Sequence, residues 1–356
     1  MAASIENAEV NIGFVEQIDE CDKWKLHSAQ FPSKLGGKPA WLSLNALPKA
    51  DLMSCPNCQD PMIFLLQIYC PLIDDDEKVD CFHRSLFIFI CKNTQCSQLN
   101  KSPNFKVFRC QLPRENKFYG YEPPLVKSID LDLNFDTKCD TLCEVCGCYA
   151  SKRCSKCKQV NYCSQNHQKL DWKYGHKSSC GMNNKTKQGA CLLFDEAELV
   201  TEPESLATDE KEKSEEEKMT EYEEFMKSNK SHSFVSGDDR NLQKMALSDE
   251  DTDKVFKEFK KRVAHEPEQV LRYSLGGQPL WVCSDNIPNS GEIPSCECGA
   301  KRQFEFQVMP QLLCHLKLDK LENSIDWGTL AVYTCSENCS EGAIYHPEFL
   351  WKQDYS

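Results

Sequence analysis

The chain has 356 residues, of which 40% are apolar and 27% are charged, and its net charge is −13. This length allows two or three domains, and the composition is ordinary for a soluble globular protein. No apolar run approaches the roughly 18 residues of a membrane span, and the opening "MAASIENAEVNIGF" lacks the basic region and apolar block of a secretory signal. We therefore expect no membrane association and a reducing compartment, the cytosol or the nucleus.

Residues 1–9 are predicted to be a flexible N-terminus, and residues 10–138 to form a β-rich unit. The segments "MIFLLQIYCPL" (62–72) and "RSLFIFIC" (84–91) are short, aromatic-rich and bounded by turn formers. These features favour buried strands over helices. The segment "QLPRENKFYGYEPP" (111–124) contains Pro, Gly and Asn, and is predicted to be an ordered loop.

Residues 139–181 are dense in cysteine and predict a compact metal-binding module. The spacing is C-x2-C-x7-C-x2-C-x5-C-x3-H-x8-H-x3-C, which supplies eight ligands for two tetrahedral zinc ions. Only 38 residues are involved, too few for a core without metal. An interleaved arrangement fits this spacing, with Cys139 and Cys148 as bystanders. The first site would then use Cys143, Cys146, Cys163 and His167, and the second Cys154, Cys157, His176 and Cys180.

This pattern resembles a MYND-type zinc finger, including "YC" before the third pair and "DW…HK…C" at the end. His167 stands where many such fingers have cysteine, and histidine is an equally good zinc ligand. The resemblance implies binding of proline-containing peptides, with Gln168 and Trp172 as the expected contacts. The alternative for Trp172 is packing on the zinc core. The finger is rich in lysine, but a solvated surface explains this as well as a nucleic-acid site does, so we do not expect nucleic acid as a partner.

Residues 182–247 are predicted to be a disordered acidic linker. Residues 195–253 hold 20 Asp or Glu against 7 Lys or Arg, a net charge of −13, and few apolar side chains to offset chain entropy. A short helix over 215–227 is the alternative. Beyond the linker, "SDEDTDKVFKEFKKRVAHEP" predicts an N-capped amphipathic helix that ends before Pro267. Residues 270–356 then return to β-like patterning.

The two β-rich parts are related by an internal repeat with an offset of 240 residues. "SKLGGKPAWL" (33–42) recurs as "YSLGGQPLWV" (273–282), and "IFLLQIYCPL" (63–72) aligns with "QFEFQVMPQL" (303–312). We interpret the Gly-Gly as a tight turn and the Trp as a residue that packs under the sheet, without a role in catalysis. The sequence therefore predicts a mainly β protein with some α: a duplicated antiparallel β-domain whose halves, 10–138 and 248–356, flank the finger and the linker.

Each half also carries two cysteine pairs in the same order around its strands. Either they bind one zinc ion in each half, in addition to the two of the finger, or they are reduced buried thiols at a hairpin base. The isolated cysteines are interpreted as small buried apolar residues. They include Cys21, Cys70, Cys81, Cys110, Cys191, Cys283 and Cys314. The paired cysteines are Cys55, Cys58, Cys91 and Cys96 in the first half, and Cys296, Cys298, Cys335 and Cys339 in the second.

Several strings together resemble the programmed cell death protein 2 family, in the branch that carries a MYND finger. They include "FPSKLGGKPAWL", "FHRSLFIFIC", "FRCQLPRENKFYGYEPP", "EPEQVLRYSLGGQPLW" and "FLWKQDYS". The resemblance implies a cytoplasmic and nuclear chaperone for a small-subunit ribosomal protein of the S2 type (uS5), which supports 40S ribosome biogenesis and stem-cell maintenance. A duplicated β-domain of the same type is expected in a yeast factor of small-subunit production.

A second function remains open: a nuclear adaptor that recruits corepressor or chromatin partners through the finger, in transcription or cell death. An enzyme is not expected. MYND fingers accompany lysine methyltransferases, which need an Asn-His pair in the catalytic domain, but the Asn-His pair here is Asn166-His167, inside the finger. The chain has no P-loop, G-x-S-x-G or H-E-x-x-H motif.

Overall fold

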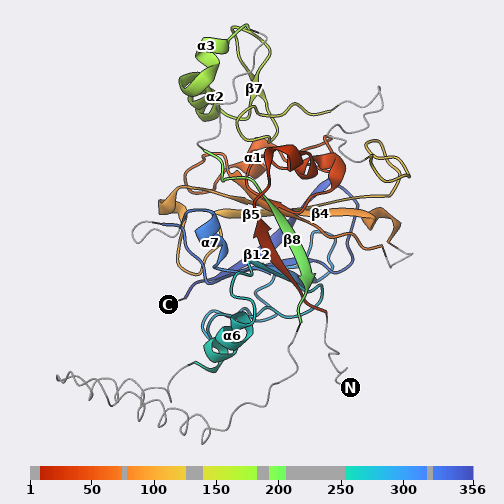
Figure 1. The fold of residues 1–356 in the computed structure, drawn as a ribbon, viewed down its shortest axis with the longest axis vertical. Coiled ribbons are helices and arrows are strands. Elements are labelled where there is room, and N and C mark those ends of the chain that lie inside the picture. Colours follow the sequence, from red (N-terminus) through yellow and green to blue (C-terminus); the bar gives the residue numbers. More distant parts are fainter. Residues whose placement is uncertain are drawn as a thin grey trace, which may run out of the picture.

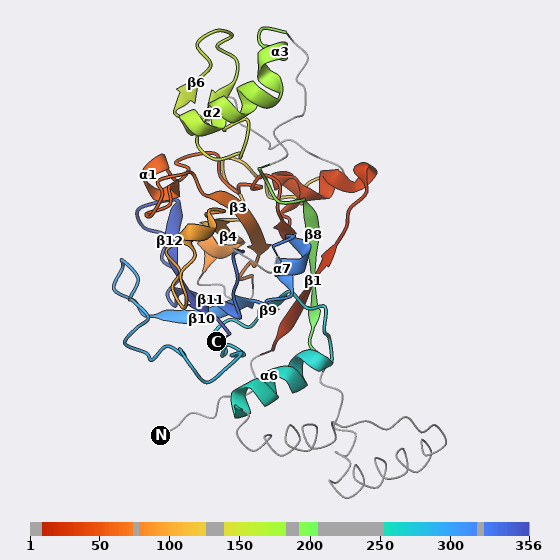
Figure 2. The ribbon, with the colours of Figure 1, turned by 90° about the vertical axis from the view of Figure 1, so that its left-hand side faces the viewer.

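The computed structural model describes residues 9–73, 78–125, 139–182, 192–205, 253–318 and 324–355. Ten strands in these ranges form one closed antiparallel barrel, and the finger lies above one end of it (Figure 1). Helix α6 lies at the opposite end in both views (Figure 2). The prediction of a mainly β protein is confirmed. None of the helices in the described ranges is long and apolar enough to cross a membrane.

The strands follow the order β1-β8-β2-β3-β4-β5-β12-β11-β10-β9 around the barrel. The first unit supplies β1 (Asn11–Glu16), β2 (Lys34–Leu35), β3 (Ile63–Tyr69), β4 (His83–Ile90) and β5 (Phe105–Leu112). The remaining five are β8 (Ala197–Pro203), β9 (Leu271–Tyr273), β10 (Arg302–Val308), β11 (Thr329–Cys335) and β12 (Tyr345–Gln353). The predicted strands at 62–72 and 84–91 correspond to β3 and β4.

Short helices connect these strands. They are η1 (Glu20–Leu26), η2 (Ser28–Gln30), α1 (Ala50–Met53), η3 (Val79–Cys81), η4 (Thr94–Cys96) and α7 (Leu312–His315). The longer helix α6 (Lys254–Ala264) forms where the amphipathic pattern predicts it, and its N-cap Asp253 accepts a hydrogen bond from the amide of Val255. Its apolar face places Phe259 and Val263 against Met309.

The strand order shows how the duplicated units combine. β2 to β5 run around one side of the barrel, β9 to β12 run around the other in mirrored order, and β5 pairs with β12. At the other seam β1 pairs with β9, β8 pairs with β2, and β1 pairs with β8. β8 therefore has the same place in the second unit as β1 in the first. The two halves complete one sheet together.

This order corrects the predicted linker over 182–247, because residues 197–203 form β8. The strand pairs with β1 over six residues, from Glu16 opposite Glu198 to Asn11 opposite Pro203. Ala197 and Leu199 are buried while Glu198 between them and Val200 after them are only partly buried, an alternation that the acidic composition hid. The acidic stretch, residues 206–252, thus falls in the chain between β8 and α6, both of which belong to the second unit. Residues 183–191 and 206–247 of the predicted linker, the alternative helix at 215–227 and residues 1–8 lie outside the described residues.

One apolar cluster fills the interior of the barrel, and a second covers the outer face of its first unit. The interior holds inward side chains of both units, such as Leu86, Ile88, Phe306 and Leu330. The second cluster lies on the outer face of the first unit and joins Trp41 and its aromatic neighbours to the finger. This outer cluster is the surface on which the candidate site is built.

Candidate metal centres and peptide surface

The finger consists of a hairpin, whose two strands have two residues each, and a helical segment. Strands β6 (Lys152–Arg153) and β7 (Asn161–Tyr162) pair, and α2 (Gln165–Asp171), the π-helical turn η5 (Trp172–His176) and α3 (Lys177–Ser179) follow. Ser164 caps α2, because its side chain accepts a hydrogen bond from the amide of His167. This cap fixes the start of the helix and therefore the position of the His167 ring.

The first ligand group has the predicted interleaved composition. The Sγ atoms of Cys146 and Cys163 lie 3.6 Å apart, and Nδ1 of His167 lies 3.1 Å from Sγ of Cys163 and 3.7 Å from Sγ of Cys143. All four ligand atoms lie within 4.8 Å of one another. Zinc–sulfur bonds of about 2.3 Å in a tetrahedron separate two sulfurs by about 3.8 Å, so this group fits zinc.

The second group brings Cys154, Cys157, His176 and Cys180 equally close. Sγ of Cys154 lies 4.0 Å from Sγ of Cys180, and Sγ of Cys157 lies 3.5 Å from Nε2 of His176. Burial opposes ionisation of Cys157, but the amides of Gln159 and Val160 and the neighbouring thiols lower its pKa to about 6. A thiol that ionises near neutral pH is ready to bind a metal ion.

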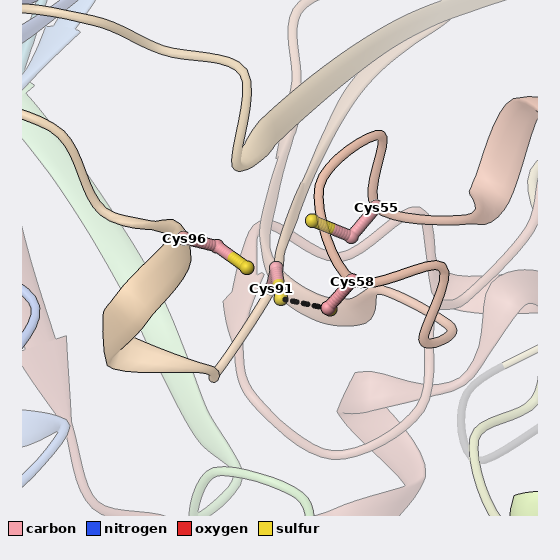
Figure 3. A group of neighbouring side chains, drawn as sticks. All are labelled: Cys55, Cys58, Cys91 and Cys96. Carbon is pink, nitrogen blue, oxygen red and sulfur yellow. Dashed lines mark hydrogen bonds between the residues drawn. The ribbon is translucent and has the colours of Figure 1, made fainter.

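Two further groups form at the barrel halves. In Figure 3 the side chains of Cys55 and Cys58, from one turn, lie close to those of Cys91, just after β4, and Cys96, in η4. The second unit brings Cys296, Cys298, Cys335 and Cys339 within the same limit of 4.8 Å. Cys139 and Cys148 belong to none of the four groups in the described ranges. Among the isolated cysteines, Cys21 and Cys314 are exposed, so the expectation that they are buried is wrong, whereas it is confirmed for Cys70, Cys81, Cys110 and Cys283.

The finger is anchored on the barrel through the first copy of the repeated string. Nε1 of Trp41 donates a hydrogen bond of 2.8 Å to the carbonyl oxygen of Gly147, which lies in the turn of the first ligand group. Inside the finger, the hydroxyl of Tyr162 donates to the Asp171 carboxylate over 2.7 Å. Burial and the hydrogen bond with Asp171 both raise the pKa of Tyr162. The hydrogen bond from Trp41 therefore joins the first ligand turn of the finger directly to the first unit.

The predicted peptide contacts, Gln168 and Trp172, lie on the outer side of the finger. Trp172 is 36% exposed, and its ring centroid lies 5.8 Å from that of the ligand His176. Gln168 is half-buried one turn earlier. Trp172 thus packs beside a ligand and also presents a face to solvent, and its role as a peptide contact stays a prediction.

A groove between the finger and the barrel was not predicted. Its volume is about 350 Å³, and its walls are the α1 region of the barrel and the β6 side of the finger. The lining includes Pro48, Met53, Pro61, Tyr149, Lys152 and Gln165. Sequence reasoning missed it because it forms only when the finger docks on the first unit, and no local pattern encodes that contact.

Together these features define a class: a β-barrel scaffold with an inserted MYND finger, which implies zinc. Family models describe residues 9–126 as programmed cell death protein 2, N-terminal domain, residues 253–354 as its C-terminal putative domain, and residues 143–180 as a MYND finger. The chain belongs to the programmed cell death protein 2 family.

Relatives support this assignment over different lengths. Programmed cell death protein 2 of Rattus norvegicus is 45% identical over 99% of this chain and 98% of its own length. Programmed cell death protein 2-like of Homo sapiens is 28% identical over 86% of this chain and 85% of its own. The probable 20S rRNA accumulation protein 4 of Schizosaccharomyces pombe is 32% identical over 25% of this chain and 24% of its own. No solved structure matches.

Proposed function

We propose that this chain is a non-enzymatic chaperone for a small-subunit ribosomal protein of the S2 type (uS5), acting in the cytoplasm and the nucleus. The protein captures the newly made client and delivers it to assembling 40S particles, and so supports proliferation and stem-cell maintenance. The name of the fission yeast relative refers to 20S rRNA accumulation, which supports a role of the family in ribosome production. The finger contributes two zinc ions, one in each ligand group.

The observation that carries the proposal is the short pairing of β5 with β12 at the seam between the two units. β5 and β12 pair only from Tyr345 opposite Cys110 to Glu348 opposite Val107, although β12 continues to Gln353. A groove of about 370 Å³ lies beside the point where they separate. An extended client segment can add to strand edges in such a groove through main-chain hydrogen bonds. Its apolar lining includes Leu52, Phe105, Val107, Phe349 and Leu350.

Capture of newly made protein tests this groove. Leu52 is 43% exposed at its edge, so Leu52→Asp should remove most of the client without unfolding the barrel. Leu99, which is 67% exposed and does not line the groove, supplies the matched control Leu99→Asp. The readout is the amount of ribosomal protein that copurifies during translation, measured by mass spectrometry. Equal recovery with both variants would refute the groove, and no enrichment over an unrelated bait would refute the chaperone function.

The acidic stretch supports the same function through charge. Residues 206–252 contain 14 Asp or Glu and 7 Lys or Arg, a net charge of −7. Such a segment attracts a basic client and competes with RNA for it, more strongly at low salt. Deletion of 206–252 retains β8 and should reduce both client affinity and its salt dependence. An unchanged salt dependence would exclude this contribution.

A second candidate function rests on the exposed face of Trp172. In this function the finger recruits nuclear corepressor or chromatin partners through proline-containing peptides. Trp172→Ala should then weaken binding of a proline-containing peptide, while Tyr174→Ala, at a neighbouring aromatic that is 44% exposed, should not. Titration of a fluorescent peptide measures both. Equal affinities of the two variants would count against the adaptor.

A further inference from the structure

The three C-x-x-C turns of the described chain share one backbone geometry. In each, the amide of the residue after the second cysteine donates to the carbonyl oxygen of the first cysteine. These hydrogen bonds are Gly147 to Cys143 at 2.9 Å, Lys158 to Cys154 at 3.0 Å and Gln59 to Cys55 at 2.9 Å. The donor residues have φ of 72°, 56° and 61°. Two of the turns hold ligands of the finger, and the third belongs to the barrel.

The second unit builds the same kind of turn with one residue fewer. The amide of Gly299 donates to the carbonyl oxygen of Cys296 over 2.9 Å, and Gly299 has φ of 89°. The amide of Cys296 in turn donates to the carbonyl oxygen of Ala300 over 2.8 Å, which closes the loop. The C-x-C spacing, unusual for a zinc ligand pair, is thus compensated by glycine at the position that needs a left-handed backbone.

The sulfur separations indicate a metal site and differ from those of disulfides. Sγ of Cys58 lies 3.6 Å from Sγ of Cys91, and the pairs Cys296–Cys339 and Cys298–Cys335 are also 3.6 Å apart. A disulfide requires about 2.05 Å, whereas tetrahedral zinc thiolates lie about 3.8 Å apart. Cys298 is exposed, so packing of buried thiols does not account for its position.

The two groups have equivalent places in the two units. Each joins the turn before one strand to the end of the strand paired with it. At these ends Ile63 lies opposite Ile90, just before Cys91, and Arg302 lies opposite Cys335. Duplication therefore preserved a four-thiolate group at the same end of β3–β4 and of β10–β11.

We infer that each barrel half binds one structural zinc ion through four thiolates, independently of the finger. The ligands are Cys55, Cys58, Cys91 and Cys96 in the first half, and Cys296, Cys298, Cys335 and Cys339 in the second. Each ion cross-links the open end of a hairpin to the turn that precedes it. The full chain then holds four zinc ions, two in the finger and two in the barrel.

The test is metal content of the full-length chain by native mass spectrometry, with elemental analysis to identify the metal. We expect four zinc ions in the wild type, three in Cys58→Ser and three in Cys298→Ser. Cys314→Ser, at an exposed cysteine outside the groups, should retain four. Two zinc ions in the wild type, iron in place of zinc, or a mass lower by two hydrogens for each disulfide would overturn the inference.

The number of zinc ions bound to the wild-type chain tests the inference even if a variant fails to fold. Cobalt substitution supplies a second measurement, since four-thiolate sites give charge-transfer and visible bands distinct from those of a site with a histidine ligand. We expect four-thiolate bands in Cys143→Ser and in Cys154→Ser, each of which damages one finger site. If both spectra contain only bands of histidine-containing sites, the barrel sites do not exist. Neither measurement depends on a client.

Discussion

Nε1 of Trp41 donates a hydrogen bond to the carbonyl oxygen of Gly147, 106 residues further along the chain. One residue belongs to the repeated string and the other to the first ligand turn of the finger. Gly147 has φ of 72°, and a Cβ at this position would lie 2.8 Å from Cβ of Lys38. The finger therefore contacts the barrel so closely that a single methyl group would not fit.

Gly147→Ala should lower the free energy of unfolding. The positive φ alone costs about 1–2 kcal/mol for a residue with a side chain, and the contact with Lys38 adds to this. Gly181→Ala is the matched control, because Gly181 has φ of 89° but a Cβ there would meet nothing within 4 Å in the described part of the chain. Chemical denaturation of both variants measures the difference. Equal losses would show that the approach to Lys38 is not tight.

Cys154→Ser separates the two candidate functions. Cys154 belongs to the ligand group beside Trp172, whereas the other group carries Gly147 and contacts the barrel. We expect loss of one zinc ion and of binding to proline-containing peptides, with unchanged copurification of the ribosomal client. Zinc content, peptide titration and client capture are measured on the same preparation. Loss of the client from a folded barrel would instead assign client binding to the finger.

Glu305→Gln should destabilise the barrel strongly. Arg84 on β4 and Glu305 on β10 form a fully buried bidentate ion pair, and Glu305 also accepts a hydrogen bond from Thr334. Burial opposes ionisation of Glu305, but Arg84 and these hydrogen bonds lower its pKa below the usual value. Removing one charge of a buried pair costs about 3–5 kcal/mol, because the other charge stays buried without compensation.

The first unit suggests the control for this pair. Glu305 is the extra residue of a bulge in β10, and the corresponding bulge in β3 contains the buried Leu65. The double variant Arg84→Met with Glu305→Leu should therefore recover much of the stability lost in Glu305→Gln. If the double variant is less stable than the single one, the pair stabilises the barrel beyond the cost of its burial.

His83 predicts a pH dependence of stability. Burial lowers its pKa to about 4, although the hydrogen bond with the Arg114 carbonyl opposes this shift, and Tyr69 donates toward its other nitrogen. An unfolded histidine titrates near about pH 6.5, so the unfolded state binds the proton first as the pH falls. The contribution of neutral His83 to the free energy of unfolding is complete above about pH 6.5 and is lost as the pH falls toward about 4.

Denaturation at several pH values between 4 and 7 measures this dependence. His83→Gln should flatten the slope, whereas His27→Gln, at an exposed histidine, should retain it. Comparing slopes between variants cancels the acid-induced release of zinc, which is common to all of them. A slope in His83→Gln equal to that of the wild type would assign the dependence to other groups.

The sequence predicts local features of this molecule better than distant contacts. β3 and β4 follow from continuous apolar runs, and the ligand groups of the finger follow from spacing alone. β8 was missed because charge dominates its surroundings while only two buried side chains, those of Ala197 and Leu199, carry the alternating pattern. The seam groove and the Arg84–Glu305 pair each unite residues of different units, and no short-range periodicity records such pairing.

Because β8 precedes the acidic stretch and α6 follows it, both ends of that stretch are held by the barrel. Glu204, just after β8, forms ion pairs with Arg262 of α6 and Arg272 of β9. A protease that cuts between 206 and 252 would thus leave all ten strands in place, with the N-terminal fragment still contributing β8 beside β1 and β2. The cleaved protein would persist as a two-chain complex, and separately expressed fragments should reconstitute it.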